Sequence, residues 1–171
     1  MRNRWSIWID IEGFSNLYIK NSNQAILYLN DLMTSVYRIG VHVFSESPDR
    51  LFIHHFGDGF IIVSDFPEKE PTRPLAICIA IMRHLLKKGV VTKAAIAAGD
   101  WRDISSCYPD EVITVAHDRR FLRIGQGIMT IIPVMGMALI SAYKLAGTDN
   151  GALLLLDTSC FSGIPSEVIY N

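Results

Sequence analysis

Apolar and polar positions alternate along this chain in patterns that predict strands and helices in turn. The run from Trp5 to Ile11 is mostly apolar on both strand faces, as expected for a buried central strand. The segment from Gly13 to Asn23 is predicted to be a turn followed by a loop. A helix is predicted from about Gln24, because apolar residues then recur at steps of three and four. The buried stripe of this helix is predicted to be Ile26, Leu29, Met33 and Val36.

A hairpin is predicted after this helix. Leu51 to Phe56 and Phe60 to Asp65 are strand-like, and the two runs flank Gly57-Asp58-Gly59. Asp-Gly between alternating apolar residues is a strong hairpin signal. We therefore expect the carboxylate of Asp58 to lie at the tip of the hairpin.

A second helix and another strand follow. The helix begins near Thr72 and stops at Gly89, and Val90 to Ala98 has the pattern of a strand. The order strand, helix, hairpin, helix, strand is the split βαβ, or ferredoxin-like, order. We predict an α+β fold in which helices pack on an antiparallel sheet, in a single domain over residues 1–171.

The pattern is weaker beyond Asp100. Val112 to Ala116 is predicted to be a strand, Met135 to Leu145 a helix, and Ala152 to Leu156 and Val168 to Tyr170 short strands. About twenty residues from Ile124 to Tyr143 carry no charge, but glycines and a proline interrupt them. This stretch is therefore predicted to form a buried strand, a turn and the start of a helix in a core or subunit interface, not a membrane span.

Composition narrows the partners and the compartment. The net charge is only -1, so no overall field favours nucleic acid or an anionic membrane. Three widely spaced cysteines with no CxxC pair indicate free thiols in a reducing compartment. Asp10 and Glu12 interrupt the first apolar run, which argues against a signal peptide. The expected location is the cytoplasm.

Two acidic residues are the leading candidates for chemistry. If the first strand lies beside the hairpin, Asp10 and Asp58 meet, and two carboxylates about 4 Å apart repel by about 4 kcal/mol at an effective dielectric near 20. A divalent metal ion removes that repulsion. The alternative for Asp58 is that it is only a turn residue. For Asp10 this alternative is weaker, because burying an acid at the end of an apolar strand costs free energy unless the acid is paired or metal-bound.

Four segments resemble motifs of class III nucleotide cyclases. The segment from Asp10 to Ser15 resembles the Asp-Ile-x-Gly-Phe-Thr/Ser motif, and Gly57 to Phe60 resembles the Gly-Asp-x-Phe hairpin. Ala95 to Gly99 is similar to the strand and glycine that follow it, and Gly136 to Leu145 falls where the family has Gly-x-x-Val-Asn-x-Ala-x-Arg-Leu. The resemblance runs in order over nearly the whole chain.

The resemblance implies a homodimer that holds two divalent metal ions, Mn or Mg, and cyclises a nucleoside triphosphate with release of pyrophosphate. By resemblance, Asp10 and Asp58 would bind both ions with help from the main-chain carbonyl of Ile11. Hard carboxylate oxygens suit these metals. The backbone amides of Gly13, Phe14 and Ser15 would cradle the triphosphate.

The sequence departs from the family where the base is read. His54 stands where adenylyl cyclases have lysine, and Pro133 stands where they have aspartate. The transition-state asparagine and arginine of the family align with Ile140 and Lys144. The usual purine pocket is therefore absent, which leaves either a domain that has lost catalysis or one that reads another base, with His54 as the base-binding candidate.

Both metal aspartates are retained, which favours an active enzyme. The length and the glycine-containing segment before Gly136 resemble the stand-alone bacterial Pycsar cyclases, which make cyclic UMP or cyclic CMP in anti-phage defence. The resemblance implies UTP more than CTP as substrate, and a separate effector that binds the cyclic nucleotide. With Asp10 and Asp58, Lys144 is a candidate catalytic residue that would neutralise phosphate charge. Arg102 is a candidate phosphate contact, and the other available arginines are Arg119, Arg120 and Arg123.

Two other classes compete with this interpretation. One is an inactive cyclase-like domain used for dimerisation or ligand sensing. The other is a palm-type polymerase or dinucleotide cyclase, which shares the strand order and the paired aspartates. The absence of a Gly-Gly-Asp-Glu-Phe hairpin and of a broad basic surface disfavours it.

Overall fold

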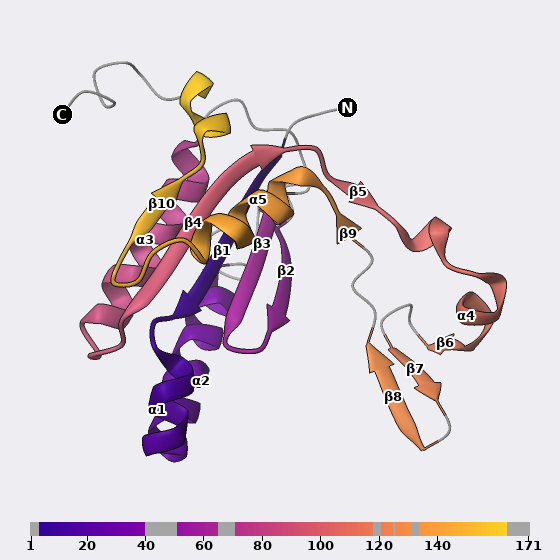
Figure 1. Cartoon of the computed structure of the whole chain (residues 1–171), viewed down its shortest axis with the longest axis horizontal. Coiled ribbons are helices and arrows are strands. Elements are labelled where there is room, and N and C mark those ends of the chain that lie inside the picture. Colours follow the sequence, from indigo (N-terminus) through magenta and orange to yellow (C-terminus); the bar gives the residue numbers. More distant parts are fainter. Residues whose placement is uncertain are drawn as a thin grey trace.

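The computed structural model describes residues 4–39, 51–64, 71–117, 121–124, 126–130 and 134–163. Its main feature is a five-stranded sheet in the order β10-β4-β1-β3-β2 (Figure 1). Neighbouring strands pair antiparallel, except that β10 runs parallel to β4. The strands are β1 (Arg4–Ile11), β2 (Leu51–Phe56), β3 (Gly59–Ser64), β4 (Thr92–Gly99) and β10 (Leu154–Leu156). The buried run predicted for the first strand is confirmed, since β1 lies in the middle of the sheet.

Helices cover both faces of this sheet. They are α1 (Phe14–Lys20), α2 (Ser22–Arg38), α3 (Thr72–Leu86) and α5 (Met137–Ala146). Helices α2 and α3 bury their apolar faces against β1, β3 and β4 in the main core. On the other face, α5 packs through Ala142 and Ala146 onto Ala95 and Ala97 of β4. These small side chains let the helix backbone lie close to the strand, and the predicted α+β architecture is confirmed.

The segment between β4 and α5 forms smaller elements that extend away from the main sheet (Figure 1). Strand β5 (Arg102–Asp103) pairs with β9 (Val134–Met135). Helix α4 (Asp110–Val115) leads into a three-stranded sheet of β6 (Ala116–His117), β7 (Phe121–Ile124) and β8 (Gly127–Thr130). Short 3₁₀ turns cover Ser105–Cys107 and Thr158–Gly163.

The prediction of a turn and loop from Gly13 to Asn23 is wrong, because most of this segment is helical. Helix α1 begins directly after Gly13, and α2 begins at Ser22. The side chain of Asn21 accepts a hydrogen bond from the backbone N–H of Gln24 at 3.1 Å, so it caps α2. The polar cluster that suggested a loop is a helix cap between two helices.

The buried stripe of α2 agrees only in part with the prediction. Val36 is buried and Leu29 packs against the core, as predicted. Ile26 and Met33 are 53% and 40% exposed, whereas Ala25 and Leu32 are fully buried. Ser35 also faces the core, and its hydroxyl donates to the carbonyl of Asp31 at 2.7 Å. The satisfied hydroxyl makes Ser35 tolerable on the buried face.

The strand predicted over Val112 to Ala116 is also wrong, because α4 occupies residues up to Val115. Asp110 and Glu111 lie in its first turn, where acidic side chains favour a helix. The strand and the helix start predicted between Ile124 and Tyr143 are confirmed by β8 and α5, but Met129 of β8 is 39% exposed and not buried. Residues 131–133, where the turn was expected, lie outside the described residues. The strand predicted over Val168 to Tyr170 lies outside the described residues.

Two predictions about the whole molecule are tested by the described residues. No helix in these ranges is both long enough and apolar enough to cross a membrane. The three cysteines, all of which lie in these ranges, are free thiols as predicted.

Candidate active site

The fold brings Asp10 and Asp58 together. Asp10 lies near the end of β1 and is the cross-strand partner of Gly59 on β3. Asp58 directly precedes Gly59 in a tight turn, whose first residue, Gly57, has a left-handed φ of 63°. Both carboxylates line one hollow of about 460 Å³. The two acids predicted to meet therefore share a site at one end of the sheet.

The carboxylate of Asp10 is partly buried and held on one side. The indole N–H of Trp8 donates a hydrogen bond of 2.9 Å to Oδ2 of Asp10. Oδ1 is buried and accepts no hydrogen bond from the described part of the chain. Burial raises the pKa of Asp10, the Trp8 hydrogen bond and the charge of Lys93 lower it, and the charges of Asp58 and Glu12 raise it.

Lys93 is a cation beside Asp10 in the sheet, and it was not among the residues predicted for the site. It is buried on β4 directly across from Asp10. Its ammonium donates to the carbonyl of Asp149 at 3.0 Å and lies 3.5 Å from Oε2 of Glu12. A single charge inside the otherwise apolar strand Thr92–Gly99 was the available signal, because a charge in such a strand needs a partner.

The donor set of the hollow fits divalent metal ions that share their ligands with a substrate. Mg²⁺ and similar ions are usually held by one or two carboxylates together with substrate phosphates and water. Asp10 offers the buried, unpaired Oδ1, and Asp58 offers a second carboxylate in the same hollow. Within the described ranges there is no cluster of three or more His, Cys, Asp or Glu residues that would form a closed protein cage. The hollow therefore suits an ion whose remaining ligands are water molecules in the free protein and phosphate oxygens when a substrate is bound.

Lys144 and Arg102 are placed very differently. Lys144, on α5, lines the hollow that contains Asp10 and Asp58. Arg102 follows β4 at the end where Gly99 pairs with Arg4, so it lies at the opposite end of the sheet from Asp10. An ion-pair distance of 3.8 Å joins Arg102 to Asp100.

The remaining arginine candidates add no contact to the hollow. Arg119 and Arg120 lie outside the described residues, and of Arg123 only its backbone position on β7 is described. Within one protomer, Lys93 and Lys144 are thus the cations that line the hollow among the described residues.

The predicted phosphate-binding segment begins at the end of β1. Gly13 has a φ of 69°, and Phe14 and Ser15 form the first turn of α1, which has no side-chain cap. A Cβ on Gly13 would meet no atom within 4 Å, so the glycine is required for its left-handed backbone and not for space within the protomer. The side chain of Ile11 is buried in the core.

An apolar groove of about 420 Å³ adjoins the charged hollow. Trp8, Phe56 and Tyr143 line both, and they form the boundary between them. The groove continues along Ile61, Leu139 and Ile140 on the sheet and on α5. Ile140 thus contributes an apolar side chain to this groove.

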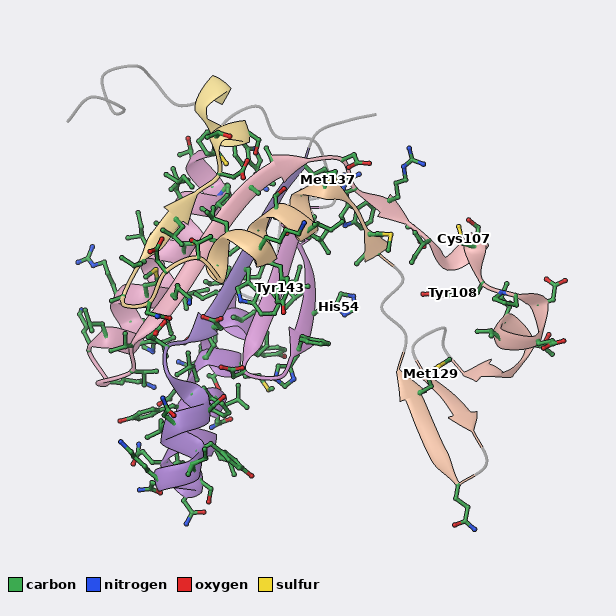
Figure 2. All side chains as sticks on the ribbon, in the orientation of Figure 1. His54, Cys107, Tyr108, Met129, Met137 and Tyr143 are labelled. Atoms are coloured by element: carbon green, nitrogen blue, oxygen red, sulfur yellow. The ribbon has the colours of Figure 1, made fainter. Side chains whose placement is uncertain are left out.

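His54 belongs to the same face of the sheet as the groove. Trp8 pairs with Ile61, and Ile61 pairs with His54, so the three form a cross-strand row over β1, β3 and β2. Figure 2 shows Tyr143 over the middle of the sheet and His54 at its outer edge beside β2. His54 does not line the charged hollow. A base contact by His54 would be made from the edge of the sheet.

The sequence matches no protein-family model and no curated protein. Solved structures are similar in three dimensions. A bacterial light-regulated adenylyl cyclase superposes with a TM-score of 0.60 at 12% identity, over 96% of this chain and 46% of that one. A class III adenylyl cyclase-like ATP-binding protein from Pseudomonas aeruginosa gives a TM-score of 0.57 at 13% identity, over 98% and 36%. The chain has the fold of the class III cyclases.

The charged hollow lies in the part of the chain that forms this fold. Asp10 and Asp58 come from the central strand and its hairpin neighbour, which belong to the five-stranded sheet. This chain spans less than half of the length of these similar structures. The class III cyclase domain predicted from the sequence motifs is thus supported at the level of the fold.

Replacing Asp10 by Asn is expected to stabilise the metal-free protein at neutral pH. The folded state raises the pKa of Asp10, so its benefit to folding is present below the ordinary aspartate pKa and is lost as the pH rises through the raised value. At pH 7 the ionised carboxylate weakens the fold, and Asn removes this cost. We expect a gain of about 1 kcal/mol, typical of single stabilising substitutions. Thermal unfolding in EDTA at several pH values measures it, and an advantage that grows as the pH falls would contradict the prediction.

Proposed function

We propose that this protein is a metal-dependent nucleotide cyclase that converts a pyrimidine nucleoside triphosphate to its 3′,5′-cyclic monophosphate. The observation that carries the proposal is the shared hollow of Asp10 and Asp58, with Lys93 and Lys144 on its walls. The two acids suit divalent metal ions, and the two cations suit the triphosphate of a substrate that binds with those ions. The class III cyclase fold supports the same chemistry.

Different residues of the hollow would contribute to different parts of the cyclisation reaction. The 3′-hydroxyl oxygen attacks the α-phosphorus, the bond from that phosphorus to the bridging oxygen breaks, pyrophosphate leaves, and the hydroxyl proton passes to water. Two Mn²⁺ or Mg²⁺ ions, when bound, activate the hydroxyl and neutralise phosphate charge. Asp10 and Asp58 would hold them, with the carbonyl of Ile11. Lys93 and Lys144 offset the charge of the leaving pyrophosphate.

The proposed preference for UTP, and next for CTP, rests on what replaces the purine-reading residues. His54 lies on the groove face of the edge strand, and the groove itself is lined by apolar and aromatic side chains. Ile140 occupies the position of the family asparagine and lies in this groove. This replacement of the purine-reading residues suits a pyrimidine, which is smaller than a purine and would be contacted by the histidine.

We propose a homodimer with composite sites. An apolar surface patch on and beside α5 includes Met135, Met137, Ile140 and Tyr143, which are all exposed in the protomer. Apolar patches next to a polar site typically mark contact surfaces. Arg102, distant from the hollow of its own protomer, would reach phosphate only in the site of its partner.

The proposed setting is the cytoplasm, where the product acts as an anti-phage second messenger on an effector that binds cyclic nucleotides.

The test is to incubate the purified protein with Mn²⁺ and each of the four ribonucleoside triphosphates separately, and to identify products by mass spectrometry. We expect a cyclic monophosphate from UTP, and less from CTP. A purine product would overturn the pyrimidine assignment and retain the cyclase. Linear or dinucleotide products would indicate a palm-type polymerase or dinucleotide cyclase.

One observation favours a second candidate, an inactive cyclase-like module for dimerisation or ligand sensing. Ile140 and Lys144 replace the asparagine and arginine that the family uses in the transition state. Lysine offers a point charge without the bidentate geometry of arginine. A folded dimer that binds nucleotide without forming any product would establish this candidate.

A further inference from the structure

Trp8 joins the proposed metal ligand Asp10 to the rest of the site. The two residues are two positions apart on β1, so their side chains lie on the same face of the sheet. Trp8 is 7% exposed, and its indole N–H donates to Oδ2 of Asp10 at 2.9 Å. A buried tryptophan needs a partner for its N–H, and here the partner is a carboxylate of the hollow.

The indole ring is itself held from two sides. A Cβ added to Gly59 would lie 2.5 Å from Cζ2 of Trp8, so the ring occupies the space that the absent side chain leaves. Tyr143 of α5 meets the ring edge-on, with centroids 4.9 Å apart and an interplanar angle of 76°. The hydrogen-bond donor is therefore fixed by Gly59 of β3 and Tyr143 of α5.

The two oxygens of Asp10 differ as a result. Oδ2 is engaged by the indole, whereas Oδ1 is buried and accepts no hydrogen bond among the described residues. Groups that hydrogen-bond a ligating side chain fix its orientation and strengthen its binding to the metal. The Trp8 ring lines both the charged hollow and the apolar groove, so its position affects the shape of both.

We infer that Trp8 is a positioning residue for the divalent metal ion. Its N–H orients the Asp10 carboxylate so that Oδ1 is directed to the ion, and Gly59 and Tyr143 keep the indole in place. This inference rests on the proposed function, because it requires a metal ion at Asp10 and Asp58. A tryptophan that only filled the core would be replaceable by another ring of similar shape without effect on metal binding.

The test measures Mn²⁺ binding in the absence of nucleotide. Electron paramagnetic resonance gives the concentration of the unbound ion. Trp8→Phe keeps an aromatic ring and removes the N–H, and it is expected to raise the Mn²⁺ dissociation constant about 10- to 100-fold. Trp5→Phe is the matched control, since Trp5 is equally buried on the opposite face of the same strand. Its Mn²⁺ affinity should stay within about twofold of the parent protein, even where its stability falls.

A second variant separates the lost N–H from the lost ring volume. Benzothienylalanine at position 8 replaces the indole N–H by sulfur with nearly the same shape, so the fold is retained if Trp8→Phe does not fold. The inference requires the same loss of Mn²⁺ affinity in this variant. Parent-like affinity in it would overturn the inference.

The outcome for Asp58→Asn separates the proposed metal site from the proposed role of Trp8. If the parent protein binds Mn²⁺ and Asp58→Asn weakens it, the proposed metal site stands, and the variants at position 8 decide the role of Trp8. If the parent protein binds no Mn²⁺, or if Asp58→Asn leaves binding unchanged, the proposed metal site is overturned and the inference with it.

Discussion

Asp58→Asn is expected to lower cyclic nucleotide formation by at least about a thousandfold while the protein remains folded. Asp58 lies in a two-residue turn at the edge of the hollow, so the amide is accommodated without repacking. The change removes one of the two carboxylates available for divalent ions, and the other, on Asp10, cannot hold both. Initial rates with Mn²⁺ and UTP measure the loss, and circular dichroism verifies the fold.

Asp110→Asn is a suitable control for this variant. It makes the same chemical change at an exposed carboxylate in the first turn of α4, which does not line the hollow. Its rate should remain within about twofold of the parent rate, as is usual for surface changes away from a site. If Asp58→Asn still formed product at a comparable rate, the two-carboxylate mechanism would be wrong.

Local sequence signals predicted the elements that build the hollow. The alternation around Gly57-Asp58-Gly59 specifies a hairpin by turn chemistry alone, and the apolar run before Asp10 specifies a buried strand. Once both strands exist, pairing of β1 with β3 in the observed register places Asp10 beside Gly59. The juxtaposition of the acids thus follows from short-range information and one strand pairing.

Features that depend on tertiary packing were not predictable in this way. On α2, Ile26 and Met33 continue the apolar stripe but are exposed, whereas Ala25 and Ser35 are buried, and residue spacing alone does not reveal this difference. Lys93 was missed because its relation to Asp10 depends on the pairing of β4 with β1. The position of the Trp8 ring depends on the missing side chain of Gly59, whose space the ring fills, and no periodicity reveals this.

The position of α5 is set by a close junction with the end of β4. A side-chain oxygen of Asp100 accepts the N–H of Met137 at 2.8 Å, so Asp100 caps the helix from a distant part of the chain. A Cβ on Gly99 would lie 2.7 Å from the backbone nitrogen of Ala138. Because α5 carries Tyr143 and Lys144, this junction determines where two walls of the hollow lie.

Gly136→Ala is expected to destabilise the protein by about 3 kcal/mol, the upper end for added volume in a packed site. The new Cβ would lie 2.1 Å from the carbonyl oxygen of Asp100, and this contact with backbone cannot be relieved by a side-chain rotation. The melting temperature should fall by about 10 °C, and activity should fall with it as α5 shifts. Gly147→Ala, at the other end of α5, provides the control, since its Cβ would come no closer than 3.4 Å to the Lys144 carbonyl. Equal melting temperatures for the two variants would show that the junction with Asp100 does not fix the helix.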